Sequence, residues 1–448
     1  MNPIMMQLCR RCKQLASAPF RFVLLLAVTL FLTAGQTCSV SSAAQPPRYQ
    51  NTIRGRQFYR SLTVSYTPHI PRRAIFYQRF AYTLGLLSIV WHVLGLWLLL
   101  RSGLSAGIRA KVNYTAPNKK THKRLAPPFR TVALFVFAYM VIMLLWSLPV
   151  HIAGYLLEHH FGFSRQTPAG FVMDSIRGLL VSLILIPLIW GTYWLQAKQP
   201  RRWWLFLWAL ALPLLCTESV LQPILIAPLY NRFTPLPAGR LRTDLLALAA
   251  HAGITNAHIF VADTSKRTTH VNAYVTGIGP TTRIVIEDTG LRLLPEDQIL
   301  AMMGHEMGHY VERHVWILLF SNVLGAGGIL WLIAKLLPRL IFRKRRVYRL
   351  KGINDVAALP LVLLTLYLIL ELQMPVANAL SRYLEHRADA FGLQTTHLNM
   401  ASARLYVGFA ERDYSDPDPP LLLHLWFGSH PTLKQRSDFA LRFHAPNN

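Results

Sequence analysis

The sequence predicts a mainly α-helical protein that crosses a membrane several times. Hydrophobic residues make up 52% of its 448 residues and charged residues only 15%, which departs from the composition of soluble domains toward that of membrane proteins. The apolar residues collect in segments about as long as the ~20 residues that a helix needs to span a bilayer. The basic residues collect in short runs between those segments, as they do in the loops of membrane proteins.

The amino terminus has the order of features found in a secretory signal peptide. Basic residues precede an apolar run from Phe22 to Ala34, and the small residues Ser42-Ala43-Ala44 follow it. The apolar run is about 13 residues long, which is shorter than the ~20 residues of a usual spanning helix. We therefore expect residues 1–44 to be a signal peptide, or a short membrane anchor if they are retained, and residues 45–79 to form an external segment.

Six further segments are long and apolar enough to span a hydrocarbon core of ~30 Å at ~1.5 Å per residue. Four of them fall within residues 80–222 and two within residues 315–377. Residues 223–314 and 378–448 are then left to form a domain outside the hydrocarbon core. The expected spans are Phe80 to Leu100, Thr131 to Val150, Gly178 to Leu195, Trp203 to Gln222, Val315 to Leu337, and Val356 to Ala377.

The basic connections between these spans predict the orientation of the chain. The formal net charge is +27, and lysine and arginine are concentrated after the first, third and fifth spans. Such connections stay on the cytoplasmic side, so we expect the outer domain to face the periplasm or exterior of a bacterial inner membrane. Arginines between Arg48 and Arg79 act against this orientation. No groove-reading module accompanies the charge, so the lipid bilayer is an expected partner and nucleic acid is not.

The run His305-Glu306-Met307-Gly308-His309 carries the main chemical signal of the sequence. Residues 295–297 are a proline and two acids, which predicts a helix start, and the apolar pattern continues through the run into the fifth span. On such a helix, His305 and His309 lie one turn apart and are able to bind a single zinc ion. Glu306 is displaced by about 100° around the helix, so it reaches a water molecule without being a ligand.

A second helical face supplies the remaining residues that a catalytic zinc site needs. Catalytic zinc takes three protein ligands and leaves one position to water, so we expect Glu385 to be the third ligand and Asp389 to accept a hydrogen bond from a ligand imidazole. We expect Arg382 to hold a carboxylate in place beside the metal, with Asn378 on the same face. The alternative for Glu385 is a salt bridge with Arg382 or Arg387.

The other histidines are not expected to take part in this site. His314 follows His309 by five residues, and that spacing places it off the ligand face of a continuous helix. We expect His151, His258 and His424 to lie at the surface or at the membrane interface.

Together these residues resemble the integral-membrane zinc proteases of the type I CAAX prenyl protease family, which process isoprenylated carboxyl termini in eukaryotes and have bacterial relatives. The similarity extends from about Phe80 to Arg436, and its motifs are jointly very specific. Besides the 305–309 run, the matching segments are Phe161 to Thr167, Pro228 to Phe233, His270 to Tyr274, Ser381 to Asp389, and His430-Pro431 with Arg436.

The resemblance implies a bundle of membrane helices that encloses a chamber and is capped by the zinc-peptidase domain. It implies that the substrate backbone pairs as an added strand beside Asn272 and Ala273, a mode that recognises main chain and leaves side chains loosely specified. It also implies that His430 and Arg436 lie close to the metal and stabilise the oxyanion. From its own apolar residues, the segment Arg283 to Glu287 is predicted to be a neighbouring strand.

We therefore expect a zinc endopeptidase of the gluzincin type, with one Zn²⁺ per chain and Glu306 as general base. Its substrate would be a peptide or protein, lipidated or inserted in the membrane. The expected orientation differs from that of eukaryotic relatives, whose zinc domain points to the cytosol, so a quality-control protease without prenyl specificity is the alternative. A transporter or an inactive scaffold is disfavoured because internal repeats are absent and every expected catalytic residue is present.

Overall fold

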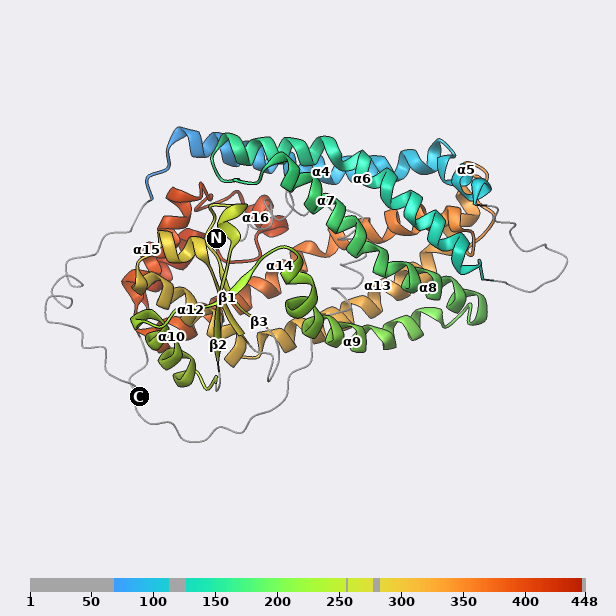
Figure 1. Ribbon diagram of the computed structural model, residues 1–448. Helices are drawn as coiled ribbons and strands as arrows, with labels where there is room; N and C mark the ends of the chain where they lie inside the picture. Colours follow the sequence, from blue (N-terminus) through green and yellow to red (C-terminus); the bar gives the residue numbers. More distant parts are fainter. Residues whose placement is uncertain (1–67, 113–125, 255–256, 277–282, 445–448) are drawn as a thin grey trace, which may run out of the picture.

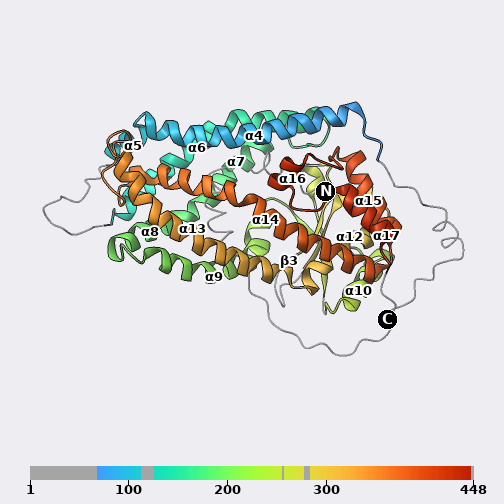
Figure 2. The same ribbon diagram turned by 180° about the vertical axis from the view of Figure 1, so that it is seen from behind.

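The computed structural model describes residues 68–112, 126–254, 257–276 and 283–444. The expected signal peptide and most of the expected external segment lie outside the described residues. A bundle of long helices occupies one half of the molecule, and a domain containing a small sheet occupies the other half (Figures 1 and 2). The predicted fold class, a polytopic helix bundle joined to a domain with a small β-sheet, is confirmed.

Five helical segments of the described chain are long and apolar enough to cross a membrane, and a bent pair of helices makes a sixth if its two parts are counted as one span. The third span is broken by a turn of 3₁₀ helix before Pro187, because proline removes a backbone donor and clashes with the preceding turn. The sixth segment bends by 51° between Trp203–Thr217 and Gln222–Leu229. The spans are α4 (Arg72–Arg101), α6 (Phe129–His160), α7 (Pro168–Ser182) with η3 (Leu183–Leu185) and α8 (Ile186–Lys198), α9 (Trp203–Leu221) with η4 (Gln222–Ile226) and η5 (Ala227–Leu229), α13 (His314–Lys344), and η8 (Val356–Ala358) with α14 (Leu359–Thr396).

The helices are longer than the apolar segments that predicted them. α4 begins at Arg72 rather than Phe80, and α6 continues to His160 rather than Val150. α14 runs without interruption to Thr396, so that the last span and the predicted polar stripe belong to one helix. Hydropathy marks only the apolar part of a helix, whereas the polar ends of these helices continue because they pack against the peptidase domain.

The expected continuous helix from residue 295 into the fifth span is not formed. The metal-motif helix is α12 (Glu296–Val311), and α13 begins separately at His314. Between them Arg313 adopts a left-handed conformation with φ of 56°, which ends the regular ladder of helical hydrogen bonds. The break redirects the chain, and its consequence for His314 is described with the site.

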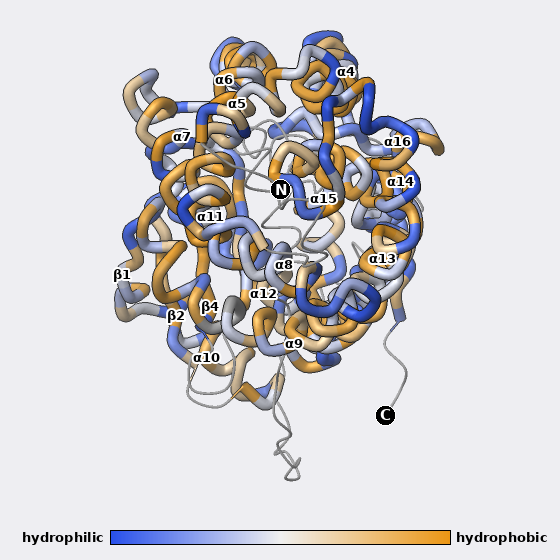
Figure 3. Tube along the Cα trace, turned by 90° about the vertical axis from the view of Figure 1, so that its right-hand side faces the viewer, coloured by the Kyte–Doolittle hydropathy of each residue, from blue (hydrophilic) through white to orange (hydrophobic). Residues whose placement is uncertain are grey.

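The bundle forms one large core only at the end remote from the peptidase domain. That core combines the remote parts of α4, α6, α9, α13 and α14. Nearer the peptidase domain the helices contact each other in pairs, for example Leu84 with Val150 and Leu215 with Leu319. Figure 3 looks along the bundle from its remote end, with the apolar residues in orange on the helices around the periphery. Packing is therefore shared at one end and pairwise along the middle.

A buried ion pair closes the remote end of the bundle. Arg109 of α5 (Leu104–Lys111) pairs with Asp355, which also caps η8 by accepting from the amide of Ala357 at 3.0 Å. Ser105 donates a hydrogen bond to the carbonyl of Ala357 at 2.8 Å. Since a buried charge is tolerated only when it is paired, these contacts fix α5 against the connection between α13 and α14.

The peptidase half contains a four-stranded mixed sheet in the order β1-β2-β4-β3. β2 and β4 are parallel, while β1 and β3 pair antiparallel with their neighbours. The strand predicted over Arg283–Glu287 is confirmed as β4, and among the described strands β3 lies at an edge of the sheet. The strands are β1 (Phe233–Pro235), β2 (His258–Ala262), β3 (Ala273–Thr276) and β4 (Arg283–Glu287).

Helices surround this sheet and share a second core with it. The core joins the inner faces of β2, β3 and β4 to α10, α12, α15 and α17. The elements are α10 (Arg240–His251), η6 (Thr264–Lys266), α11 (Asp288–Leu293), α12, α15 (Asn399–Arg412), α16 (Leu421–Phe427) and α17 (Leu433–Arg442).

α12 and α14 approach each other through glycines, which places their backbones almost in contact. A Cβ atom added at Gly392 of α14 would lie 2.8 Å from the amide nitrogen of His305, and one added at Gly304 of α12 would lie 2.5 Å from a methyl group of Thr396. A Cβ atom added at Gly308, one turn further along α12, would lie 3.1 Å from the carbonyl oxygen of Ala388. This spacing brings together the two helices that carry the predicted metal ligands.

Replacing Gly392 by alanine is predicted to force α14 away from α12. Overpacking of this kind costs about 1–3 kcal/mol, and it also separates Glu385 from the two histidines. We expect a lower melting temperature in detergent and less metal bound per chain. The control is Gly328→Ala in α13, where an added Cβ meets nothing within 4 Å; equal behaviour of the two variants would contradict the close approach.

Candidate metal centre

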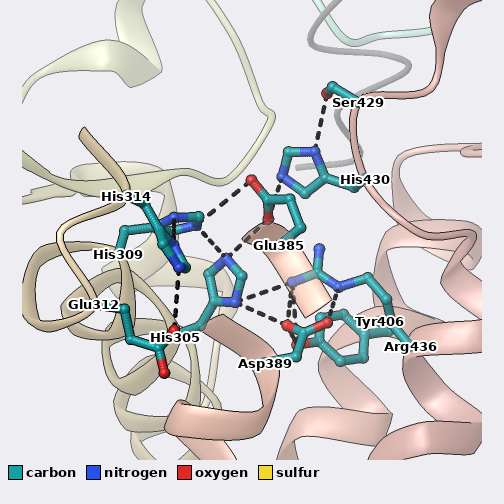
Figure 4. A network of polar contacts seen from close by, with 10 residues as sticks. All are labelled: His305, His309, Glu312, His314, Glu385, Asp389, Tyr406, Ser429, His430 and Arg436. Atoms are coloured by element: carbon teal, nitrogen blue, oxygen red, sulfur yellow. Dashed lines mark hydrogen bonds and ion pairs between the residues drawn. The ribbon is translucent and has the colours of Figure 1, made fainter. Parts of the chain in front are cut away.

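Three side chains from two helices converge at the predicted metal site. Nε2 of His305 and Nε2 of His309 lie 3.2 Å apart on α12. The carboxylate of Glu385 on α14 lies 3.2 Å from His305 Nε2 and 3.5 Å from His309 Nε2 (Figure 4). One ligand atom from each residue falls within 4.8 Å of the others. Two imidazole nitrogens and one carboxylate fit the His₂Glu donor set of a catalytic metal site.

The local sequence explains why these atoms meet. Pro295 precedes α12 as its N-cap, and Glu296 and Asp297 occupy its first turn, where acids are favoured by the helix dipole. The spacing of four residues places His305 above His309 on one face. Glu385 faces them because α14 continues past its apolar span and contacts α12 at the glycines.

Asp389 and Arg436 support His305 from behind. Asp389 Oδ1 lies 2.8 Å from His305 Nδ1, which leaves Nε2 directed toward the metal position. Arg436 of α17 donates from Nε to Asp389 Oδ2 at 2.8 Å, and its Nη2 lies 3.3 Å from His305 Nδ1. The hydroxyl of Tyr406 donates to Asp389 at 2.7 Å. An imidazole held in this way has a fixed tautomer and orientation, which favours metal binding.

The electrostatics of the site suit a cation. Burial by itself lowers the pKa of His305, but the facing carboxylate of Asp389 outweighs burial and raises that pKa to about 10. The carboxylates of Asp389 and Glu385 therefore favour positive charge beside them. Burial raises the pKa of Glu306, and the neighbouring histidines reduce that rise. Glu306 is thus a stronger base than an exposed glutamate.

His430 lies beside Glu385, and the chain before it is fixed to α14. Its Nε2 is 2.9 Å from Glu385 Oε2, and its Nδ1 is 3.0 Å from the hydroxyl of Ser429. Asn378 donates to the carbonyl of Trp426 at 2.7 Å, and Arg382 donates to the carbonyl of Gly428 at 2.7 Å. Arg382 therefore contacts backbone rather than the carboxylate that we expected, and with Asn378 it positions the segment that leads to His430.

His314 lies outside the group formed by His305, His309 and Glu385, as expected, but it is buried against His309. Its Nδ1 lies 3.0 Å from Nδ1 of His309, and its Nε2 lies 3.3 Å from Glu312. The break at Arg313 turns the chain, so the spacing rule for a continuous helix does not apply. Glu312 also pairs with Arg387 at 2.9 Å, so that Arg387 is engaged there rather than with Glu385.

Two other histidines are more buried than the sequence indicated. His151 is 1% exposed and His424 is 8% exposed, whereas His258 is exposed as expected. His151 contacts Ser147 in the preceding turn of α6, at 3.3 Å.

Asn272 and Ala273 lie where β3 begins. The carbonyl of Asn272 accepts from the amide of Glu287 at 3.0 Å, and Ala273 stands opposite Ile286. Backbone groups alternate in direction along an antiparallel strand, so the N–H and C=O of Ala273 point away from β4. In the described part of the sheet, that direction is the open edge.

A buried polar cluster, which the sequence did not reveal, fixes the start of this edge strand. His270 is 1% exposed, and its two ring nitrogens lie 3.4 Å from Asp413 and 3.5 Å from Glu158. Tyr77 of α4 donates to Glu158 of α6 at 2.6 Å, and Phe163 stacks on His270. The cluster ties β3 to two membrane helices. Only the match at residues 270–274 hinted that His270 has a role.

Comparisons with known proteins agree with this geometry. The chain matches the model of Peptidase family M48 over residues 235–442, and the model described as CAAX prenyl protease N-terminal, five membrane helices, over residues 43–232. It is 36% identical over 347 residues to YhfN, an uncharacterized metalloprotease of Bacillus subtilis, covering 77% of this chain and 80% of that protein. The chain belongs to the CAAX prenyl protease family. It is a membrane metallopeptidase of M48 type.

Further relatives support the membership of this metallopeptidase in the CAAX prenyl protease family. A CAAX prenyl protease 1 homolog of Arabidopsis thaliana is 30% identical over 320 residues, covering 68% of this chain and 72% of that protein. The crystal structure of Ste24p from S. mikatae superposes with a TM-score of 0.70, covering 96% of this chain and 97% of that chain at 21% identity. The similarity at this low identity demonstrates a shared fold.

Replacing Asp389 by asparagine is predicted to weaken metal binding about 10- to 100-fold, the usual effect of losing such a partner of a ligand imidazole. The neutral amide no longer stabilises the orientation of His305 or balances the charge of Arg436. Competition with a chelator measures the affinity. Asp438→Asn on α17 is the control, because it removes the same charge without touching His305, and it should leave the affinity unchanged. An unchanged affinity for Asp389→Asn would contradict the assigned support.

Proposed function

We propose that this protein is a zinc endopeptidase that cleaves peptide substrates at the bilayer surface. The observation that carries the proposal is that the Nε2 atoms of His305 and His309 face Glu385 of another helix. Glu306 lies between the two histidines in the sequence of α12, and its pKa responds to both of them. This arrangement supplies three ligands and an adjacent base, which metal-assisted hydrolysis requires. His305, His309 and Glu385 would hold the zinc ion.

Each residue of the site has a defined part in hydrolysis. When bound, zinc supplies a Lewis acid that lowers the pKa of water and polarises the scissile carbonyl. Glu306 takes the proton from the attacking water and later delivers it to the leaving amine. His430 donates to the negative charge that develops on the carbonyl oxygen. Arg436, which binds Asp389, would support His305 rather than take the expected role at the oxyanion. Asp389 keeps His305 in the tautomer that the metal needs.

The substrate backbone is proposed to add as a strand to β3. The outward N–H and C=O of Ala273 are available for such pairing, and Asn272 is held by Glu287 on the other side. The helices near the peptidase domain pack in pairs, and the shared core lies at the remote end. This distribution supports a chamber between the core and the metal site, through which a membrane-bound substrate would reach β3.

Two proposals share this hydrolytic chemistry and differ in the substrate. Relatives of this chain are named CAAX prenyl proteases, which supports a prenylated substrate. Recognition through the backbone of an edge strand is tolerant of side chains, which supports a quality-control protease without prenyl specificity. The basic remote ends of α4, α8 and α13 favour a cytoplasmic location of that end. The peptidase domain would then face the periplasm or exterior of a bacterial inner membrane.

Glu306→Gln is predicted to retain zinc and to lose peptide cleavage by at least about 10²-fold, because the ligands remain while the base is removed. Metal content by elemental analysis and turnover of a fluorogenic peptide in detergent are the two measurements. Substituting Glu411, a carboxylate of α15 that binds the amide of His69, by glutamine is the control. Normal turnover by Glu306→Gln would overturn the mechanism.

The substrate class is tested with a matched pair of peptides, prenylated and unprenylated, that share one sequence. Zinc removal by a chelator should abolish cleavage of both, and zinc addition should restore it. A strong preference for the prenylated peptide supports CAAX-type specificity, whereas equal cleavage supports the quality-control alternative.

Ala273→Pro is predicted to raise KM more than it lowers kcat. Proline removes the backbone donor that faces the open edge and leaves the hydrogen-bonded pairs between β3 and β4 in place. Melting temperature and zinc content show whether the fold survives. Val261, in the interior strand β2, provides a comparison because Val261→Pro removes a ladder bond and should unfold the domain. An unchanged KM for a folded, zinc-loaded Ala273→Pro would exclude the added-strand proposal.

A further inference from the structure

A cavity on the outer flank of the protein is not explained by peptide hydrolysis. It has a volume of about 500 Å³ and lies between α14, α16 and α17. Figure 2 shows these three helices beside one another on the same side of the molecule. The cavity is lined by Arg382, His386, Leu421, His424, Leu425, Pro431, Gln435, Arg436 and Phe439.

The polar lining of this cavity is basic, and none of the lining residues is acidic. Arg382 uses Nη1 to donate to the carbonyls of Gly428 and His424. The other two nitrogens of the Arg382 guanidinium make no hydrogen bond with the described residues. No carboxylate of the described residues forms an ion pair with Arg382. Arg436 lines the inner wall but is neutralised by Asp389. The charge of Arg382 is therefore the one available to a ligand, and that ligand should be an anion.

The apolar part of the lining continues onto an exposed surface of leucines and other large side chains. Leu421 and Leu422 of α16 are 69% and 76% exposed, and on α14 Leu372 and Val376 are 71% and 74% exposed. Exposed apolar side chains of this size mark a contact with lipid in a membrane protein. An occupant that reaches both the cavity and this surface has to be amphiphilic.

The cavity lies at a level along the membrane helices that corresponds to the headgroup layer of the bilayer. A hydrocarbon core of ~30 Å takes about 20 residues of helix, so a span that begins at Val356 leaves the core near Val376. Arg382 lies less than two turns beyond that point, where a long basic side chain reaches lipid headgroups. On α4, about 20 residues before Arg101, Tyr82 packs against Leu423 of α16. Two helices therefore place α16 at the same interface.

From these observations we propose that the cavity between α14, α16 and α17 binds the anionic headgroup of a membrane phospholipid. Arg382 contacts the phosphate, His386 and Gln435 offer donors at the rim, and the acyl chains lie along Leu421 and Leu422. A lipid bound there joins α14 to the segment that carries His430, so it stabilises the assembled peptidase domain on the bilayer.

Gln435→Glu tests the proposal without disturbing the fold. Gln435 occupies the third position of α17 and forms a capping box with Thr432, and glutamate serves equally well in that motif. The substitution places a carboxylate in the cavity, and like charges repel a headgroup phosphate. The matched control is Gln298→Glu, because Gln298 occupies the third position of α12 outside the cavity.

The measurement uses the full-length protein in neutral detergent, titrated with phosphatidylglycerol or phosphatidylcholine and observed by native mass spectrometry and by melting temperature. The wild-type protein and the Gln298→Glu variant should bind phosphatidylglycerol, and both should melt at a higher temperature when this lipid is present. Gln435→Glu should bind it about tenfold more weakly, with unchanged stability in the absence of lipid. Phosphatidylcholine should produce the smaller shift in every case.

Two results would overturn the proposal. One is equal binding of phosphatidylglycerol by Gln435→Glu and the original chain. The other is equal binding of glycerol 3-phosphate, which carries the same phosphate without acyl chains and would identify a site for a free phosphate instead. The Glu306→Gln variant should bind lipid like the original chain, so the outcome is independent of the proposed hydrolysis.

Discussion

The near contact between the backbones of α12 and α14 is the constraint on which the site depends. Gly304, Gly308 and Gly392 remove the side chains that would hold the helices apart. The two histidines of α12 and the carboxylate of α14 then lie at distances that suit one metal ion. Arg436 and Tyr406, from two further helices, hold Asp389 against the first of these histidines. A change in helix spacing would disturb all of these contacts together.

The membrane bundle also contributes to the position of the site. α14 is both a membrane span and the carrier of Glu385, so this carboxylate is placed by a helix anchored in the remote core. The buried cluster around His270 connects the start of β3 to α4 and α6 through Tyr77 and Glu158. The edge strand and Glu385 are thus both positioned by helices of the same bundle. Because the membrane helices position both Glu385 and β3, the peptidase domain depends on the membrane spans for its arrangement.

Local patterns predicted much of this molecule. Hydropathy located the spans because a helix in lipid must be apolar for most of its length, although it gave shorter helices than the structure has. The strand β4 and the start of α12 at Pro295 followed from nearby residues. The break at Arg313 did not, since nothing in the apolar pattern marks the residue that adopts a positive φ. The contact between His314 and His309 was not predicted for that reason.

The sequence by itself determined the class of protein, the spans, and the residue types and spacings of a metal site, because helical periodicity places residues on faces. Only the tertiary structure decided which faces meet. It turned Arg382 toward backbone carbonyls instead of a carboxylate and brought Arg436 from α17 onto Asp389. It also assembled His270, Glu158 and Asp413 from distant segments. Such contacts depend on how helices pack across long stretches of chain, and no local pattern encodes that packing.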